Sequence, residues 1–158
     1  MARTSKAAAR LTEQFKQRSV EKKYWALVEP GIEPEEATLV DWLRHDDRHR
    51  RVNLAQPGTA GAKEARLEYR LLRKLPRATL VEVRLLTGRK HQIRVQLAAA
   101  GYPILGDRKY ESRRKFPAGI ALHARSLGFD HPVGGDRIEL SAPLPRSWVE
   151  FGVSERTH

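Results

Sequence analysis

Two neighbouring segments with alternating side chains constrain the fold of this chain more than any other feature. Residues 66–72 read RLEYRLL and residues 79–87 read TLVEVRLLT, so apolar side chains recur at every second position in both. A period of two places successive side chains on opposite faces of a β-strand. The short segment between them contains Pro76, a residue type that favours turns. The sequence therefore predicts an antiparallel hairpin with one apolar face and one charged face.

Helices and further strands are expected on both sides of this hairpin. An amphipathic pattern predicts a helix over residues 6–18, and Gly101 is a natural stop for a second helix over residues 91–101. Residues 44–65 are polar and rich in turn residues, which indicates a surface excursion. Additional strand candidates are residues 22–29, 37–43 (strand or helical turn), 120–129 and 137–145. The expected fold class is α+β in a single domain, with a mixed, largely antiparallel sheet and flanking helices.

Composition excludes several kinds of site. The chain has no cysteine, so disulfides and thiolate chemistry are excluded. The histidines form neither an H-x-x-H nor an H-E-x-x-H pattern, so no metal site is expected. No apolar run approaches the ~20 residues of a membrane span, and the N-terminal stretch MARTSKAAAR is too polar for a signal peptide. We therefore expect a cytoplasmic protein without a membrane partner.

The net charge of +11 is concentrated in the middle of the chain. Residues 62–94 contain ten basic and three acidic residues, and residues 95–125 contain six basic and two acidic ones. A concentrated basic region favours a polyanionic partner, most often nucleic acid. The alternative is a basic face that only contacts solvent.

The segment over residues 85–107 reads LLTGRKHQIRVQLAAAGYPILGD and places a strand end, a Thr-Gly turn and a helix start in series. A helix start carries unpaired amide donors and partial positive charge, so it suits a phosphate or a carboxylate. Arg89, in this turn, could keep a catalytic carboxylate ionised. A surface cap with solvated basic side chains is the alternative.

Several segments together resemble the RluA-type pseudouridine synthases. The stretch LLTGRKHQIRVQLAAAGYPILGD is similar to the family's L-x-T-G-R-x-H-Q-I-R block followed by G-x-P-I-x-G-D-x-x-Y. ALHARSLGFDHPVGG resembles its A-L-H-A-x-x-L-x-F-x-H-P-V block, and ARTSKAAAR with EKKYWALV resembles its A-K-T-S-K-A-A and E-K-x-Y-x-A-L-V segments. These blocks follow the family's order along nearly the whole chain. The resemblance implies a pseudouridine synthase-like catalytic domain that isomerises uridine in structured RNA, either ribosomal or transfer RNA.

The resemblance also implies roles for individual residues. Arg89 would pair with the catalytic aspartate and Tyr24 would stack on the uracil, so these two side chains should lie side by side at one cleft. The resemblance implies neither a metal nor an organic cofactor. The residues expected to bind RNA are Lys90, Gln92, Arg94, Arg108, Lys109, Arg113, Arg114 and Lys115.

The family's catalytic aspartate lies in an H-R-L-D block, and this sequence contains no such block. Counted from Tyr24, the block would fall before Met1, so we expect a catalytic domain that lacks its N-terminal part and is inactive alone. Two explanations stay open: a shortened form of a working enzyme, or a natural fragment that serves as a non-catalytic RNA-binding module on the same fold. Such a domain should expose a sheet edge and could self-associate through it. A smaller departure is Gln96, which stands where the family often has histidine.

Overall fold

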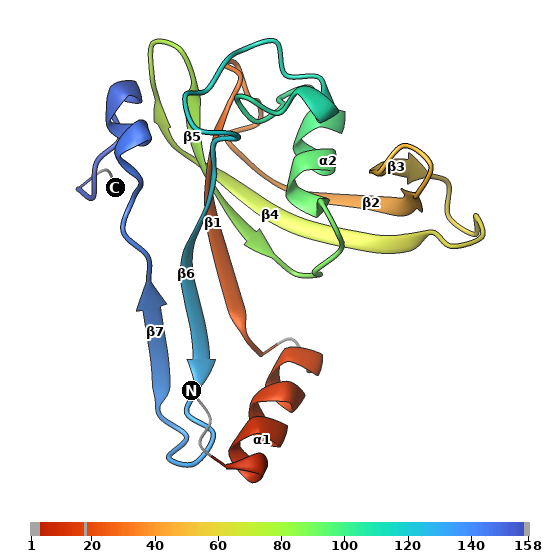
Figure 1. Ribbon diagram of the computed structural model, residues 1–158, viewed down its shortest axis with the longest axis vertical. Helices are drawn as coiled ribbons and strands as arrows, with labels where there is room; N and C mark the ends of the chain where they lie inside the picture. The colour runs from red at the N-terminus through yellow and green to blue at the C-terminus, as the bar shows by residue number, and fades with distance from the viewer. Residues whose placement is uncertain (1–3, 18, 157–158) are drawn as a thin grey trace.

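A computed structural model describes residues 4–17 and 19–156 of the chain. In this part, seven strands form one antiparallel sheet in the order β3-β2-β4-β5-β1-β6-β7 (Figure 1). The elements are α1 (Ser5–Lys16), β1 (Glu21–Val28), β2 (Glu36–Asp46), β3 (Arg51–Ala55), β4 (Lys63–Lys74), β5 (Thr79–Leu85), α2 (Gln92–Ala99), η1 (Arg108–Tyr110), β6 (Leu122–Asp130), β7 (Arg137–Ser141) and η2 (Arg146–Phe151), where η denotes a 3-10 helix. The expected α+β class with a largely antiparallel sheet is confirmed.

The predicted hairpin is formed by β4 and β5, with Tyr69 opposite Val83 and Leu71 opposite Val81. Tyr69, Val81 and Val83 are buried, and Leu97 of α2 belongs to the same hydrophobic cluster. Gln92 and Gln96 of α2 donate to backbone carbonyl oxygens at the start of β4, so this helix covers that part of the apolar face of the hairpin. Each fully buried side chain of this size contributes about 1.5–3 kcal/mol of hydrophobic stabilisation.

Residues 44–65, expected only as a surface excursion, contribute the end of β2, the whole of β3 and the start of β4. In the β2–β3 pair, Leu43 lies opposite Leu54 and His45 lies opposite Val52. β3 is the last strand on one side of the sheet and is short, with apolar Val52 and Leu54 alternating with polar Arg51 and Asn53, and Val52 is buried. This alternation covers only five residues and stands among polar and turn-forming residues, so the segment was interpreted as an excursion.

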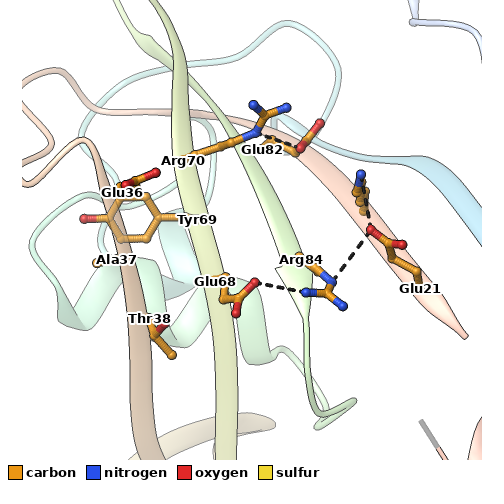
Figure 2. Close-up of a pocket in the computed structure, with 10 residues that line it drawn as sticks. Glu21, Glu36, Ala37, Thr38, Glu68, Tyr69, Arg70, Glu82 and Arg84 are labelled. Carbon is orange, nitrogen blue, oxygen red and sulfur yellow. Dashed lines mark hydrogen bonds and ion pairs between the residues drawn. The ribbon is translucent and has the colours of Figure 1, made fainter. Parts of the chain in front are cut away.

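The charged face of the hairpin carries a ladder of ion pairs that joins β4, β5 and β1 (Figure 2). Arg70 lies 3.0 Å from Glu82, while Arg84 lies 3.3 Å from Glu68 and 3.7 Å from Glu21. The ladder borders a hollow of about 500 Å³. Because the side chains are partly exposed, each pair is worth only about 0–1 kcal/mol. The pairing does neutralise the basic side chains of this face, which lowers its attraction for polyanions.

Helix α1 is attached to the sheet through polar bonds at the end of β6. Gln14 donates from Nε2 to the carbonyl oxygen of Asp130 at 2.7 Å and accepts from its backbone N–H at 2.9 Å. Phe15, on the helix face expected to be apolar, is 51% exposed. The helix ends at Lys16, and Arg18, at the end of the expected helix, lies outside the described residues. The side of α1 that carries Phe15 therefore remains open to a ligand or partner.

Candidate active site between α1 and the start of α2

The turn after β5 is fastened by the buried side chain of Gln92, which is 2% exposed. Its Oε1 accepts from the hydroxyl of Thr87 at 2.8 Å and from the backbone N–H of Arg89 at 2.9 Å. Its Nε2 donates to the carbonyl oxygen of Arg66 at 2.9 Å, on the neighbouring strand. Both ends of the amide are therefore used inside the protein. This geometry favours a positioning role for Gln92 over the RNA contact expected of it.

Arg89 is the side chain that this turn presents to a groove. Its Nε donates to the carbonyl oxygen of Glu64 at 2.9 Å, which fixes the plane of the guanidinium group. Within the described part of the chain, its two terminal nitrogens have no hydrogen-bond partner. A guanidinium group held in this way can bind a carboxylate or a phosphate through two parallel bonds.

The groove beside Arg89 has a volume of about 850 Å³ and lies between α1, the start of β1 and the turn after β5. Its charged lining consists of Lys16, Glu21, Lys22, Glu64, Arg66, Arg84, Arg89 and Arg137. Arg66 is paired with Glu64 at 2.6 Å. Lys16, Lys22 and Arg89 have no carboxylate partner among residues 4–17 and 19–156. The groove therefore has an excess of unpaired positive charge and suits an anionic ligand.

Tyr24 lies in a neighbouring hollow rather than in this groove. That hollow is bordered by β1, β6 and β7, and Lys22 lines both it and the groove. A Cβ atom on Gly88 would lie 3.3 Å from Nζ of Lys22, so the lysine reaches the turn that carries Arg89. Because Tyr24 follows Lys22 by two positions in a strand, both side chains point to the same face of the sheet. The structure thus brings Tyr24 and Arg89 to one face, in adjacent hollows, without a direct bond between them.

Arg94 is turned inward onto a buried carboxylate. Its Nε and Nη2 lie 2.7 and 2.8 Å from the two carboxylate oxygens of Asp107, which is 1% exposed. Hydrogen bonding to Asp107 raises the pKa of the Arg94 guanidinium group. The pair connects α2 with the loop that leads into η1. Arg94 is therefore better suited to holding that loop than to contacting RNA.

The remaining residues expected to bind RNA are exposed and follow one path, from the start of α2 through η1 into the loop after it. They are Lys90, Arg108, Lys109, Arg113, Arg114 and Lys115. Within the described part of the chain, none of these side chains is paired with a carboxylate. They are available for phosphate contacts, and their contact with RNA stays a prediction.

Sequence patterns missed the contribution of Lys22, and only its alternation with Tyr24 could have suggested it. They also missed a cluster centred on Tyr110, which is considered separately below. In residues 4–17 and 19–156, no group of three or more acidic or histidine side chains could hold a metal ion. No helix in the same part of the chain is long and apolar enough to cross a membrane.

Comparison with known proteins defines the class to which this chain belongs. Residues 1–99 match the family model described as RNA pseudouridylate synthase. The chain therefore belongs to the RNA pseudouridylate synthase family, and the resemblance seen in its sequence blocks is confirmed.

Two curated relatives illustrate this membership. The chain is 36% identical over 152 residues to an uncharacterized RNA pseudouridine synthase of Bacillus subtilis, with 96% of the chain and 49% of the relative covered. It is 37% identical over 162 aligned positions to ribosomal large subunit pseudouridine synthase D of Xanthomonas campestris, with 92% and 47% covered. The chain thus spans about half the length of the curated relatives it matches.

Two solved human structures have the same fold. RNA pseudouridylate synthase domain containing 1 superposes with a TM-score of 0.75 at 28% identity, covering 91% of this chain and 62% of the human one. RNA pseudouridylate synthase domain containing 4 superposes with a TM-score of 0.74 at 26% identity, covering 92% and 66%. The sheet described above is therefore that of a pseudouridylate synthase domain.

Proposed function

We propose that residues 1–158 form a partial catalytic domain of an RNA pseudouridine synthase, an isomerase that converts uridine to pseudouridine in structured RNA. The observation that carries this proposal is the cation-lined groove at the turn of Arg89, in a chain that belongs to this family. The reaction breaks the bond between C1′ and N1 and joins C1′ to C5. N1 gains a proton and C5 loses one, so no redox partner is needed.

Arg89 would hold the catalytic carboxylate in its ionised form. The bond from its Nε to the Glu64 carbonyl leaves two terminal nitrogens for this carboxylate, and such a contact lowers the pKa of the acid. The carboxylate would come from an H-R-L-D segment, which these 158 residues do not contain. The chain on its own is therefore expected to bind RNA without turnover.

Tyr24 would hold the uracil ring by stacking and assist removal of the proton at C5. Lys22 borders both the hollow of Tyr24 and the groove of Arg89. A uridine turned out of its RNA helix or loop, at a cost of a few kcal/mol, could therefore reach both residues past Lys22. Positioning of the Arg89 turn would fall to Gln92, and positioning of the loop before η1 would fall to Arg94.

RNA is the proposed partner. The name of the Xanthomonas relative, ribosomal large subunit pseudouridine synthase D, makes large-subunit ribosomal RNA the first substrate to test, and transfer RNA the second. The exposed cations at positions 90, 108, 109 and 113–115 would contact phosphates and release counterions. A cytoplasmic location likewise stays a prediction.

The alternative is a non-catalytic RNA-binding module on the same fold. It is favoured by the absence of an H-R-L-D segment from the sequence. The enzyme proposal and the binding-module proposal both require RNA binding. Only the enzyme proposal requires that the groove complete an active site when the missing carboxylate is supplied.

An activity assay separates the two proposals. The chain would be incubated with bulk ribosomal RNA and with transfer RNA, both alone and fused to an N-terminal segment that carries an H-R-L-D block. Pseudouridine would be quantified by mass spectrometry of nucleosides. The enzyme proposal expects turnover by the fusion only, and its loss in Arg89→Ala with much of the RNA affinity retained. A folded fusion that binds RNA but forms no pseudouridine would support the binding module instead.

A further inference from the structure

Three non-glycine residues with left-handed backbone conformation gather around one buried side chain, Tyr110. Arg50, His91 and Glu111 have φ values of 49°, 54° and 72°. His91 contacts the Tyr110 hydroxyl, Glu111 follows Tyr110 directly, and the carbonyl oxygen of Arg50 accepts a bond from Lys109, the residue before Tyr110. Such conformations are costly for residues with a side chain and concentrate where a protein builds a functional site. This cluster lies outside the groove of Arg89.

The Tyr110 hydroxyl lies against Nδ1 of His91. Its oxygen accepts from the backbone N–H of Val52 at 2.9 Å, and Nδ1 of His91 lies 2.7 Å away. When the hydroxyl donates its proton to Nδ1, the neutral ring carries its own proton on Nε2. Burial lowers the pKa of His91 from its usual 6.5, and the neighbouring cations Arg94, Lys109 and Lys90 lower it further. In that tautomer, neutral His91 presents an Nε2–H donor near Arg94, Lys109 and Lys90.

The Tyr110 ring is flanked by two guanidinium groups that differ in one respect. The central carbons of Arg94 and Arg51 lie 4.9 and 5.2 Å from the ring centroid. Arg94 is neutralised by Asp107 at 2.7 Å. Arg51 has no carboxylate partner in the described part of the chain, and its buried Nε has no hydrogen-bond partner. A partly buried guanidinium group without an anion is unfavourable, so an anionic ligand that pairs with Arg51 would stabilise the site.

The acidic groups near the cluster do not pair with Arg51. Asp107 is bound to Arg94, and Asp46 is bound to His49 at 2.8 Å. Glu111 is exposed and lines a small hollow together with Arg51 and Tyr110. Asp47, whose carbonyl oxygen accepts from the backbone N–H of Arg50, is exposed as well, and neither acid has an ion-pair partner among the described residues, so both would oppose an incoming anion.

We propose that Arg50, Arg51, His91 and Lys109, gathered around Tyr110, form a phosphate-binding subsite for the RNA strand next to the nucleotide held in the Arg89 groove. The proposal rests on RNA being the partner of this chain. Two residues of backbone span at most ~7 Å, so the Cα atoms of Arg89 and His91 are close enough for one strand to contact both. The guanidinium groups and the lysine would neutralise phosphodiester charge, and Nε2 of His91 would donate to a phosphate oxygen.

The test is RNA affinity measured as a function of salt. A fluorescently labelled RNA hairpin with uridines in its loop would be titrated with the chain, and binding followed by anisotropy. The double variant Arg50→Gln/Arg51→Gln should weaken binding roughly tenfold near physiological salt and reduce the salt slope by about 1.4, since each lost single-strand phosphate contact reduces it by about 0.7.

A matched control removes the same charge elsewhere. Arg70→Gln/Lys74→Gln also loses two cations, but both are exposed and already paired with Glu82 and Glu35. This control should change affinity less than about twofold, because distant exposed charges are screened by salt. Circular dichroism would verify that both double variants are folded.

Two single variants test the chemistry of the subsite. His91→Asn tolerates the left-handed backbone and removes the Nε2 donor. It should weaken binding several-fold without changing the salt slope, because a neutral donor releases no counterion. Glu111→Gln should strengthen binding, since it removes the opposing acid that lines the hollow of Arg51.

The outcomes distinguish this inference from the proposed function. If the folded wild-type chain shows no RNA binding at any salt concentration, RNA is not its partner and both proposals fall. If it binds RNA but Arg50→Gln/Arg51→Gln matches the Arg70→Gln/Lys74→Gln control in affinity and slope, the subsite is overturned and the proposed function stands.

Discussion

Arg94 holds Asp107 through two parallel bonds of 2.7 and 2.8 Å, at a point where the carboxylate is almost entirely removed from solvent. Arg94 belongs to α2 and Asp107 directly precedes η1, so the pair fastens the segment between these two elements. A carboxylate in this position depends on its partner, because burial of an unpaired charge is strongly unfavourable.

Replacement of Asp107 by alanine should lower the free energy of unfolding by about 3–5 kcal/mol, because it leaves the guanidinium of Arg94, 19% exposed, without its anion. Urea unfolding followed by circular dichroism measures this. Lys74→Gln is the control, since the Lys74–Glu35 pair is 69% and 67% exposed and should be worth less than ~1 kcal/mol. Equal losses in the two variants would show that Arg94 and Asp107 contribute no more than a surface pair.

Gln96 provides a second test of buried polarity. It is fully buried, donates from Nε2 to Asp41 at 2.8 Å and to the carbonyl oxygen of Ala65 at 3.2 Å, and its Oε1 has no partner in the described part of the chain. The variant Gln96→Glu has nearly the same shape but turns a carboxylate toward these acceptors. We expect a loss of about 3–5 kcal/mol at neutral pH.

This loss should depend on pH in a defined direction. The folded-state pKa of the introduced acid would be raised above its unfolded value of ~4.3. Its penalty therefore grows as the pH rises above that value and shrinks as the pH falls to it, where a protonated acid can donate to Asp41. Gln96→Met, which carries no charge, should differ from wild type by a nearly constant amount. A Gln96→Glu penalty that is the same at low and neutral pH would contradict this account.

The free energy of unfolding of the wild-type chain should depend on pH through the protonation of His91. Burial and the nearby cations lower the pKa of His91 from 6.5 in the folded state. Between that lowered value and 6.5, the unfolded chain binds the proton more readily, so stability falls as the pH decreases through this interval. His91→Asn should lose less stability than wild type between about pH 7.5 and about pH 5. Urea unfolding at a series of pH values measures the difference, and parallel curves for the two proteins would argue against it.

Self-association through a sheet edge is a further proposal. β3 and β7 are the two ends of the sheet, and each pairs on one side only within the described residues. Leu54 on β3 and Leu140 on β7 are 47% and 53% exposed. We expect concentration-dependent dimers in sedimentation velocity, which Leu54→Lys or Leu140→Lys should abolish at the edge that is used, because a lysine disfavours edge pairing. A wild-type chain that stays monomeric at high concentration would refute the proposal.

The sequence by itself determined the parts of this protein that repeat a local pattern. The alternation in residues 66–72 and 79–87 predicted the β4–β5 hairpin, because a buried strand records its two faces in every second residue. The turn at Thr87 and Gly88 and the following helix were likewise predicted from local signals, and the sequence blocks that resemble the pseudouridine synthases indicated the family. β3 was missed because its alternation covers only five residues and stands among polar and turn-forming residues.

Only the tertiary structure decided how the polar residues near the site are used. Gln92 and Arg94 have the same sequence context as Lys90, yet two of the three point inward to partners on other elements. Arg51 and Tyr110 meet although they are far apart in the chain. Strand register and loop closure between distant segments decide which charged side chains have a partner of opposite charge and which do not. A local pattern can predict which face of an element is covered, but the group that covers it comes from another part of the chain.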